Sequence, residues 1–414
     1  EIAALALTTL AVIAPGSPED DDQAILAVRK RYAQALPRRR LAPRTRVSKP
    51  GEPLRVGFLS SFYHRRNWMK PVWGLINHHD RERVQVHLFV DSPEGRLEGG
   101  YSPRDEDQLH DVHQLSNDQA ALRIASAGID VLIDLNGYSR QNRLGVLAAG
   151  PAPVAVGWFN LYATTGMEDY DFLIGDDRAI PTAEEANYVE RILRVSGSYL
   201  SFEVLYPTPD VAPPPCASND FFTFGSLVSQ YKIADEVMDA WATILREADG
   251  ARLLLKNVAL EEEGNREDLL ARFAERGVAA DRVLLEGPAE HYDFLQAYNR
   301  VDAALDSFPY NGGTTTTEAI WQGVPVLTFS GDRWASRTSA TILQAGGLSE
   351  FVAANREEHI RDAVQLARDP NAAERLGELR RGMRDRLRGS QVCDMDAFAR
   401  EMEELYLQAL SEVS

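Results

Sequence analysis

Residues 303–322 carry the sequence AALDSFPYNGGTTTTEAIWQ. A short apolar strand, Ala303–Leu305, leads into a turn with two glycines and four threonines, and a helical segment, Glu318–Gln322, follows at once. Glycine lets a backbone approach a ligand closely, and the first amides of a helix lack internal partners and carry partial positive charge. The stretch therefore predicts a strand–turn–helix unit that binds an anion, typically a phosphate. The alternative is a turn that only caps its helix; no Gly-Lys-Ser/Thr follows, so this is not a Walker loop.

The same alternation of apolar strands and helices covers most of the chain. Strands are predicted between residues 54 and 174 and again between 221 and 328, with amphipathic helices between them. This pattern is typical of parallel sheets covered by helices. The proline-rich segment 206–218 separates the two series and suits a connector. Because ligands bind outside the carboxyl ends of parallel strands, we expect an α/β protein with a binding site in a cleft between two lobes.

We divide the chain into three parts on this basis. Residues 1–45 are predicted to form N-terminal helices, residues 52–205 a first lobe, and residues 216–414 a second lobe that includes the helical tail. The N-terminal helices are compatible with the end of a helical-repeat array, although one helix pair cannot establish a period.

Composition and charge exclude several classes of protein. The 414 residues include 62 acidic and 44 basic side chains, giving a net charge of −18, which argues against a nucleic acid or an anionic membrane as the main partner. No run reaches the length of a membrane span, and the apolar start lacks the basic region of a signal peptide, so we expect a cytoplasmic protein. The two cysteines, Cys216 and Cys393, form no metal-ligand cluster.

Polar residues follow or flank several predicted strands. Lys232 lies in the loop after the first strand of the second lobe, where a compact positive charge suits a phosphate; a lone lysine there is also an ordinary surface group. Glu318, inside the helix after the threonine-rich turn, can accept hydrogen bonds from a ribose. In the first lobe Asp130 and Asp134 flank a strand, and His64 follows the first strand. Each is a candidate base, and each also fits ordinary strand-end or turn chemistry.

Other catalytic motifs are missing from the sequence. No histidine and carboxylate set has metal-ligand spacing, and there is no Gly-x-Ser-x-Gly nucleophile elbow. The first strand is not followed by Gly-x-Gly-x-x-Gly, which disfavours a dehydrogenase. We therefore expect no metal site.

Six segments together resemble the catalytic region of the O-GlcNAc transferase/SPINDLY family. They occur in the family's order within about residues 52–410: 54–60, 128–138, 151–154, 230–233, 305–318 and 323–328. The resemblance implies a GT-B fold with two Rossmann-like lobes, usually preceded by tetratricopeptide repeats, which would account for residues 1–45. It implies a metal-independent, inverting glycosyltransferase without a cofactor. Such an enzyme moves a sugar from UDP-GlcNAc, GDP-fucose or a related donor, with UDP-GlcNAc preferred here, to Ser or Thr of a protein.

The resemblance also implies roles for individual residues. Lys232 resembles the family's diphosphate-contacting lysine, and Gln230 resembles the glutamine beside it. Glu318 resembles the ribose-binding carboxylate. Phe294 stands where a histidine usually faces the nucleobase, and it can stack on a base without hydrogen-bonding to it. Gly313, Thr314 and Thr315 resemble the family's diphosphate-binding turn, and we expect the adjacent Thr316 to contact the donor as well.

The sequence departs from the family's pattern mainly in the first lobe. Arg66 replaces a histidine in the loop after the first strand, although His64 lies two residues away, and the segment 160–163 replaces Gly-Tyr-Pro-Gly. Donor-phosphate residues are thus kept better than acceptor-side residues. We expect direct displacement at the anomeric carbon, with Lys232 and the turn stabilising the leaving diphosphate. Asp130, Asp134 and His64 are the candidate bases, and the leaving phosphate itself is a further one.

Two other functions fit the same residues. A GT-B transferase acting on a glycan or small molecule predicts transfer without a protein acceptor. A non-catalytic nucleotide-sugar-binding scaffold predicts donor binding without turnover. The N-terminal helices favour a protein acceptor, because repeat arrays present concave binding surfaces.

Overall fold

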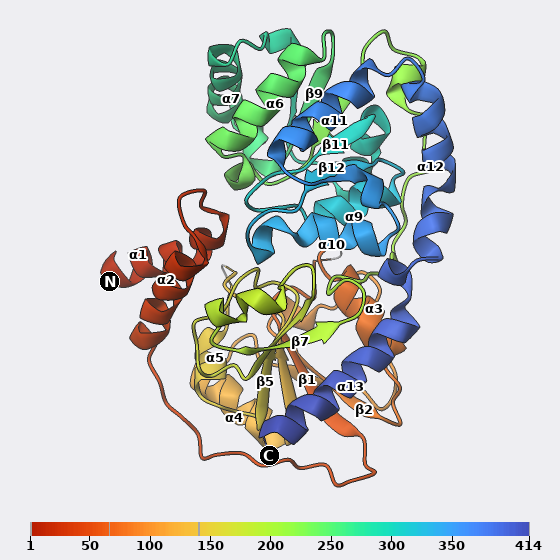
Figure 1. Ribbon diagram of the computed structural model, residues 1–414. Coiled ribbons are helices and arrows are strands. Elements are labelled where there is room, and N and C mark those ends of the chain that lie inside the picture. The colour runs from red at the N-terminus through yellow and green to blue at the C-terminus, as the bar shows by residue number, and fades with distance from the viewer. Residues whose placement is uncertain (1, 66, 140, 414) are drawn as a thin grey trace. The chain divides into compact units, whose positions relative to one another are not determined.

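The computed structural model describes residues 2–65, 67–139 and 141–413. The chain forms two compact units, Glu1–Tyr206 with Asp394–Ser414, and Pro207–Cys393. Each unit is built on one sheet with helices packed against it (Figure 1). The predicted α/β architecture of two Rossmann-like lobes is confirmed. Arg66, which stands where the family often has a histidine, lies outside the described residues.

The first unit contains a seven-stranded parallel sheet. Its strand order is β3-β2-β1-β4-β5-β6-β7, so the chain reverses direction across the sheet between β1 and β4. Such a reversal is a topological switch point, where the loops after the two central strands diverge. The strands are β1 (Leu54–Ser60), β2 (Val84–Val90), β3 (Gln108–Asp111), β4 (Val131–Asp134), β5 (Val154–Gly157), β6 (Phe172–Asp176) and β7 (Arg191–Val195).

The helices of the first unit begin and end at recognisable capping residues. Helix α4 starts with a capping box, in which Ser116 and Gln119 each accept a hydrogen bond from the other's backbone amide. It ends at Gly128, whose φ of 67° is the left-handed conformation that glycine adopts easily. The helices are α1 (Ile2–Ile13), α2 (Asp22–Ala35), α3 (Lys70–His78), α4 (Asn117–Ala127), α5 (Leu144–Ala148) and α13 (Met395–Val413).

The second unit contains a six-stranded parallel sheet. Its order, β10-β9-β8-β11-β12-β13, is the 3-2-1-4-5-6 order of dinucleotide-binding Rossmann folds, with the switch point between β8 and β11. Leu253 and Leu255 of β9 pack with Trp241 and Phe273 in the core on one face of this sheet. The strands are β8 (Thr223–Ser226), β9 (Arg252–Lys256), β10 (Val283–Glu286), β11 (Ala303–Leu305), β12 (Val326–Phe329) and β13 (Val352–Ala353).

Helices connect the strands of the second unit. They are α6 (Asp235–Glu247), α7 (Glu263–Glu275), α8 (His291–Gln296), α9 (Thr314–Trp321), α10 (Thr338–Ala345), α11 (Arg356–Arg368) and α12 (Ala372–Arg388). No helix in the described ranges is both long enough and apolar enough to cross a membrane.

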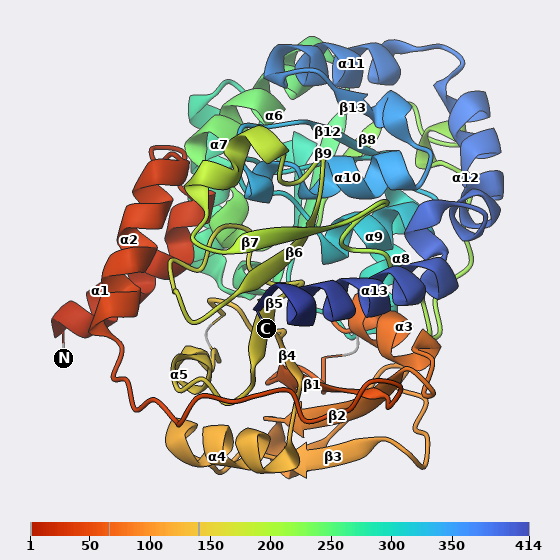
Figure 2. The ribbon, with the colours of Figure 1, turned by 60° about the horizontal axis from the view of Figure 1, so that its bottom comes forward.

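The C-terminal helix α13 belongs to the first unit rather than to the second, where we had expected it. It packs against α3, as Figure 2 shows, and against β7. Phe398 contacts Trp158 with ring centroids 5.9 Å apart, and the buried Glu403 accepts a hydrogen bond from the amide of Asp80. The apolar face of the tail is therefore buried by the first lobe, which sequence periodicity alone does not reveal.

The N-terminal helices also pack on the first unit, and one buried arginine joins them to it. Arg29 of α2 donates to the carbonyl of Ala11 in α1 at 3.1 Å and to that of Thr164, in the loop after β5, at 2.7 Å. Its guanidinium lies 4.1 Å from the ring centroid of Tyr138. Gly166 is in direct contact with α2, because a Cβ at this position would lie 2.6 Å from the backbone of Arg29.

We predict that Arg29→Met releases α1 and α2 from the first lobe. The change removes charge-assisted hydrogen bonds to buried carbonyls, which should cost about 3 kcal/mol, or roughly a 100-fold larger opening constant. Hydrogen exchange followed by mass spectrometry should show faster exchange over Asp22–Ala35, with little change in β1. The exposed Arg31, replaced by Met, is the matched control. Equal exchange in both variants would contradict the anchoring role.

Candidate functional site

The residues expected to bind the donor meet at the switch point of the second unit. Lys232 lies in the loop after β8 and donates from Nζ to the carbonyl of Asn311, in the turn after β11, at 2.6 Å. Nζ also lies 3.9 Å from the ring centroid of Tyr310. Loss of solvent around the half-buried lysine lowers its pKa to about 8, an effect that the carboxylate of Asp306 opposes. The lysine is thus fixed beside the threonine-rich turn.

A buried carboxylate holds the threonine-rich turn in shape. Asp306, directly after β11, accepts hydrogen bonds from the amides of Ser307 and Gly312 at 2.9 and 2.8 Å. Its second oxygen accepts from the hydroxyl of Thr328 at 2.8 Å. Burial raises the pKa of Asp306, while these hydrogen bonds act in the opposite direction. These hydrogen bonds all come from within the chain, so the shape of the turn does not depend on a ligand.

The turn ends at the start of helix α9, and its geometry requires glycine. A Cβ on Gly312 would lie 2.5 Å from Thr315 Oγ1 and 2.7 Å from Thr316 Oγ1. The helix begins without a side-chain cap at Gly313, so its first amides are available to a ligand. A hollow lies beside this helix start, lined by residues that include Leu227 and Val228 after β8 and Asp306, Thr315 and Thr316.

Thr316 has a structural partner as well as its place in the turn. Its Oγ1 lies 2.7 Å from Ser339 Oγ, and Ser339 Oγ donates to the carbonyl of Gly312 at 2.9 Å. The hydroxyl of Thr316 is therefore linked through Ser339 to the backbone of the turn. Donor contact by Thr316 remains a prediction, and its backbone amide is the group suited to it.

Glu318 lies next to a histidine that the sequence analysis did not single out. His291 Nε2, on α8, is 2.9 Å from Glu318 Oε1, and the carboxylate is buried. Phe294 is three residues further along α8, on the same side of the helix as His291. The structure therefore adds His291 to the expected ribose-binding residue and shows that Phe294 lies on the same helix as this histidine. No sequence motif marks His291, since its partner is 27 residues away.

Gln230 lies on the same loop as Lys232. Its Oε1 accepts a hydrogen bond from Asn257 Nδ2 at 3.1 Å, and Asn257 follows β9. The glutamine is therefore positioned by the neighbouring strand's loop.

This arrangement offers positive charge from two fixed sources. One is the ammonium of Lys232, and the other is the amino terminus of α9. Together they suit a diphosphate and can stabilise the charge that develops on it as a leaving group. Within the described ranges no three or more His, Cys, Asp or Glu side chains are grouped to hold a metal ion.

Asp130 does not lie where a catalytic base is needed. It precedes β4, so it sits at the amino edge of the sheet, opposite the edge where ligands bind. It is fully buried, and its carboxylate accepts hydrogen bonds from the amides of Val47, Ser48 and Arg55 at 2.6, 3.2 and 3.0 Å. This position corrects our expectation that Asp130 is a candidate catalytic base. Its hydrogen bonds join residues 47–48 and β1 to the start of β4.

Asp134 and His64 lie at the carboxyl edge of the first sheet. Asp134 is buried and accepts from the amides of Asn136 and Gly137 and from the hydroxyl of Tyr170. Burial raises its pKa to about 6, against the effect of these bonds. His64, after β1, is half-buried, and loss of solvent lowers its pKa. His64 is therefore uncharged at neutral pH and suits a base better than the fully engaged Asp134.

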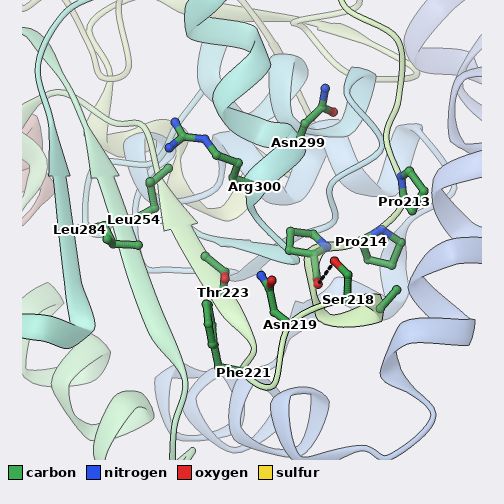
Figure 3. A pocket seen from close by; sticks show the side chains of 12 residues that line it. Pro213, Pro214, Ser218, Asn219, Phe221, Thr223, Leu254, Leu284, Asn299 and Arg300 are labelled. Carbon is green, nitrogen blue, oxygen red and sulfur yellow. Dashed lines mark hydrogen bonds between the residues drawn. The ribbon is translucent and has the colours of Figure 1, made fainter.

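A second hollow in the second unit lies away from the turn. It has a volume of about 530 Å³ and is lined mainly by carbon atoms near the amino end of β8. Figure 3 shows Leu254 and Leu284 on neighbouring strands at one side and Pro213 and Pro214 at the other. Ligands of parallel sheets bind at the carboxyl edge, so this hollow is not part of the candidate donor site.

Comparison with known proteins identifies the family of this chain. The model of the family described as glycosyl transferase family 41 matches residues 25–202 and 217–402. The probable UDP-N-acetylglucosamine–peptide N-acetylglucosaminyltransferases SPINDLY of Solanum lycopersicum and Arabidopsis thaliana are 31% and 32% identical to this chain. Each alignment covers 86% of this chain and 39% of the relative. The chain thus spans well under half the length of these relatives.

A solved structure is similar over nearly the whole chain. A mutant of the O-GlcNAc transferase of Thermobaculum terrenum superposes with a TM-score of 0.87 at 30% identity, covering 99% of this chain and 79% of that one. The predicted GT-B fold class and the predicted family are both confirmed.

We predict that Gly312→Ala weakens nucleotide binding. The added methyl group would overlap the hydroxyls of Thr315 and Thr316 and push the turn away from the start of α9. We expect the dissociation constant for UDP, measured by calorimetry, to rise about 10-fold or more, as for a strain of 1–3 kcal/mol. Gly264→Ala is the control, because a Cβ there meets nothing within 4 Å. Unchanged UDP affinity in Gly312→Ala would remove the turn from the site.

We also predict that UDP affinity falls as the pH rises through 8. Below that pH Lys232 carries its proton and attracts the diphosphate; above it, the lysine becomes neutral because its pKa is lowered to about 8. Affinity should fall by at most about 10-fold per pH unit between pH 8 and 9. Lys232→Arg should remove most of this slope, because arginine stays charged. A flat affinity profile in the unmodified protein would contradict the assignment.

Proposed function

The chain belongs to glycosyl transferase family 41, and we propose that it transfers a sugar from a nucleoside-diphosphate donor to Ser or Thr of a polypeptide. The observation that carries this proposal is the meeting of Lys232 with the threonine-rich turn at the switch point of the second unit. The names of the SPINDLY relatives support UDP-GlcNAc as the donor and a peptide as the acceptor, and the name of the Thermobaculum enzyme supports GlcNAc as the sugar.

The proposed reaction is a direct displacement that inverts the anomeric carbon. The acceptor hydroxyl oxygen forms a bond to that carbon while the bond to the β-phosphate oxygen breaks. The electron pair of the broken bond stays on the diphosphate, where Lys232 and the first amides of α9 stabilise it. Because both groups are fixed by the fold, little reorganisation is needed in the transition state.

Metal independence is part of the proposal. A leaving diphosphate needs positive charge, and here an ammonium and a helix amino terminus supply it. The hydrogen bond to Asn311 holds the ammonium at this place. No additional cofactor is needed for a displacement of this kind, because no atom changes its oxidation state.

His64 is the proposed base for the acceptor proton. Loss of solvent lowers its pKa, so the ring is neutral at pH 7 and able to accept a proton. The leaving phosphate is an alternative acceptor of that proton. Asp130 is not carried into the mechanism, because its carboxylate is bonded to three amides at the opposite edge of the sheet.

The remaining site residues are proposed to select the donor. Glu318 is suited to the ribose hydroxyls, with His291 orienting its carboxylate, and Phe294 is suited to stacking on the base. Gly313, Thr314, Thr315 and Thr316 offer amides to the diphosphate, and Gln230 lies beside Lys232. We propose further that the first lobe binds the acceptor and the second lobe binds the nucleotide-sugar, with the N-terminal helices as a separate part of the chain.

We predict that Lys232→Ala lowers sugar transfer by about 100-fold or more, as when one transition-state charge stabiliser is removed. Transfer from UDP-GlcNAc to candidate polypeptides is measured by mass spectrometry, in EDTA and without it. The exposed Lys49, replaced by Ala, is the matched control and should transfer at the normal rate. The fold should survive in both variants, since Lys232 lies in the loop after β8 and outside the apolar core of the second unit.

Two results would count against this function. Equal transfer rates in Lys232→Ala and in the unmodified protein would remove the lysine from the site. Tight UDP binding without turnover across a panel of donors and acceptors would indicate a nucleotide-sugar-binding scaffold instead of an enzyme. Transfer that requires added magnesium or manganese would contradict metal independence.

A further inference from the structure

The first unit has its own switch point, between β1 and β4, and the two loops that leave it are joined. The amide of Ser61, after β1, donates to Asn136 Oδ1, after β4, at 2.8 Å. The hydroxyl of Ser61 donates to the carbonyl of Gln141 in the same second loop at 2.9 Å. Ligands of open parallel sheets bind in the crevice outside the carboxyl ends of strands at such a point.

The side chain of Asn136 leaves one buried donor unused. Asn136 is fully buried, and its Nδ2 has no hydrogen-bond partner among the described residues. The oxygen and nitrogen of the amide cannot be exchanged, because the Ser61 amide is a donor and must face Oδ1. Leaving a buried donor unpaired is costly, so the retained Nδ2 is suited to an acceptor outside the described residues, such as a bound ligand.

The surroundings of Asn136 fit a ligand site. Two more polar atoms on these loops have no partner in the described part of the chain, Ser139 Oγ and His64 Nδ1. The neighbouring loop after β5 is tightly packed, since a Cβ on Gly137 would lie 2.1 Å from the carbonyl oxygen of Asn160. That loop also holds two non-glycine residues with left-handed backbones, Phe159 at φ 81° and Tyr162 at φ 58°. Backbone of this kind is often found beside ligands.

We propose that Asn136 positions the substrate at the first unit by donating a hydrogen bond from Nδ2 to a substrate oxygen. The oxygen is a carbonyl or hydroxyl, carried either by the acceptor polypeptide or by the sugar that is transferred. Ser139 and His64 line the same site. Asn136 forms no covalent bond and moves no proton. This inference rests on the proposed glycosyl transfer, and it adds a residue of the first unit to it.

The substitution Asn136→Asp tests the hydrogen-bond donor Nδ2 separately from the acceptor Oδ1. Aspartate keeps an oxygen to accept the Ser61 amide and replaces the Nδ2 donor with a second acceptor. We expect kcat/KM for transfer to a Ser/Thr peptide to fall about 10-fold or more at pH 8, as for the loss of one hydrogen bond with an oxygen facing an oxygen. Part of this loss should be recovered near pH 5.5, because a protonated carboxyl group can donate again. A purely structural residue would show no such recovery relative to the unmodified protein.

Gln141→Glu provides the matched control from the same loop. The side chain of Gln141 is exposed, so the same amide-to-carboxylate change there removes no buried hydrogen-bond donor. This variant should keep its kcat/KM and show no pH-dependent recovery. Calorimetry with UDP should give the same affinity in both variants, since the diphosphate residues lie in the second unit.

The kinetic constants then identify the source of the oxygen. A raised KM for the peptide assigns it to the acceptor, and a raised KM for the donor assigns it to the sugar; either supports the proposal. Unchanged kcat/KM in a folded Asn136→Asp protein overturns it. If that variant does not fold, Asn136→Ala serves instead, with the same expected loss and no recovery at low pH. Absence of transfer by the unmodified protein would overturn the proposed function and this inference together.

Discussion

Buried aspartates at both ends of the fourth strand hold each half of this protein together. At the amino end of this strand, Asp130 in the first unit accepts a hydrogen bond from the amide of Arg55, near the start of β1. In the second unit Asp302 accepts one from the amide of Thr223, at the start of β8. At the carboxyl end of the fourth strand Asp134 or Asp306 accepts the amides of the turn that follows. Central strands of a sheet expose backbone amides where they begin and end, and such groups must be paired when they are buried. The threonine-rich turn after β11 and the turn after β4 that contains Asn136 are both held by such a carboxylate.

Much of the fold could be predicted from apolar runs, and the failures have physical causes. β1 and β2 are largely buried on both faces, so apolar residues predominate in them although each also contains polar residues. β3 is not among the predicted strands because three of its four residues are polar and the strand is largely exposed at the sheet edge, and β13 is not among them because it has only two residues. Helix α13 was assigned to the wrong lobe because an amphipathic pattern shows that a face is buried but not which partner buries it.

The donor site was more predictable than the first-lobe site. The strand, glycines and threonines of the turn are consecutive in sequence, and Lys232 follows the neighbouring strand, so the switch point brings them together. His291 was missed because its pairing with Glu318 depends on how α8 packs. Asp130 was wrongly predicted as a candidate base although its sequence position argues against that role. A residue directly before a parallel strand lies at the amino edge of the sheet, and ligands bind at the carboxyl edge. The spacing Asp-x-x-x-Asp, present at 130–134 and at 302–306, would have identified both pairs as one structural device.

The hydrogen bond from Lys232 to Asn311 has a consequence for affinity. A lysine side chain carries about 2 kcal/mol of rotamer entropy when it moves freely. Here the carbonyl of Asn311 and the ring of Tyr310 already restrict that motion. Most of the entropy is therefore lost when the protein folds and not when a diphosphate arrives. A lysine with the same charge on a flexible loop would bind the same anion more weakly.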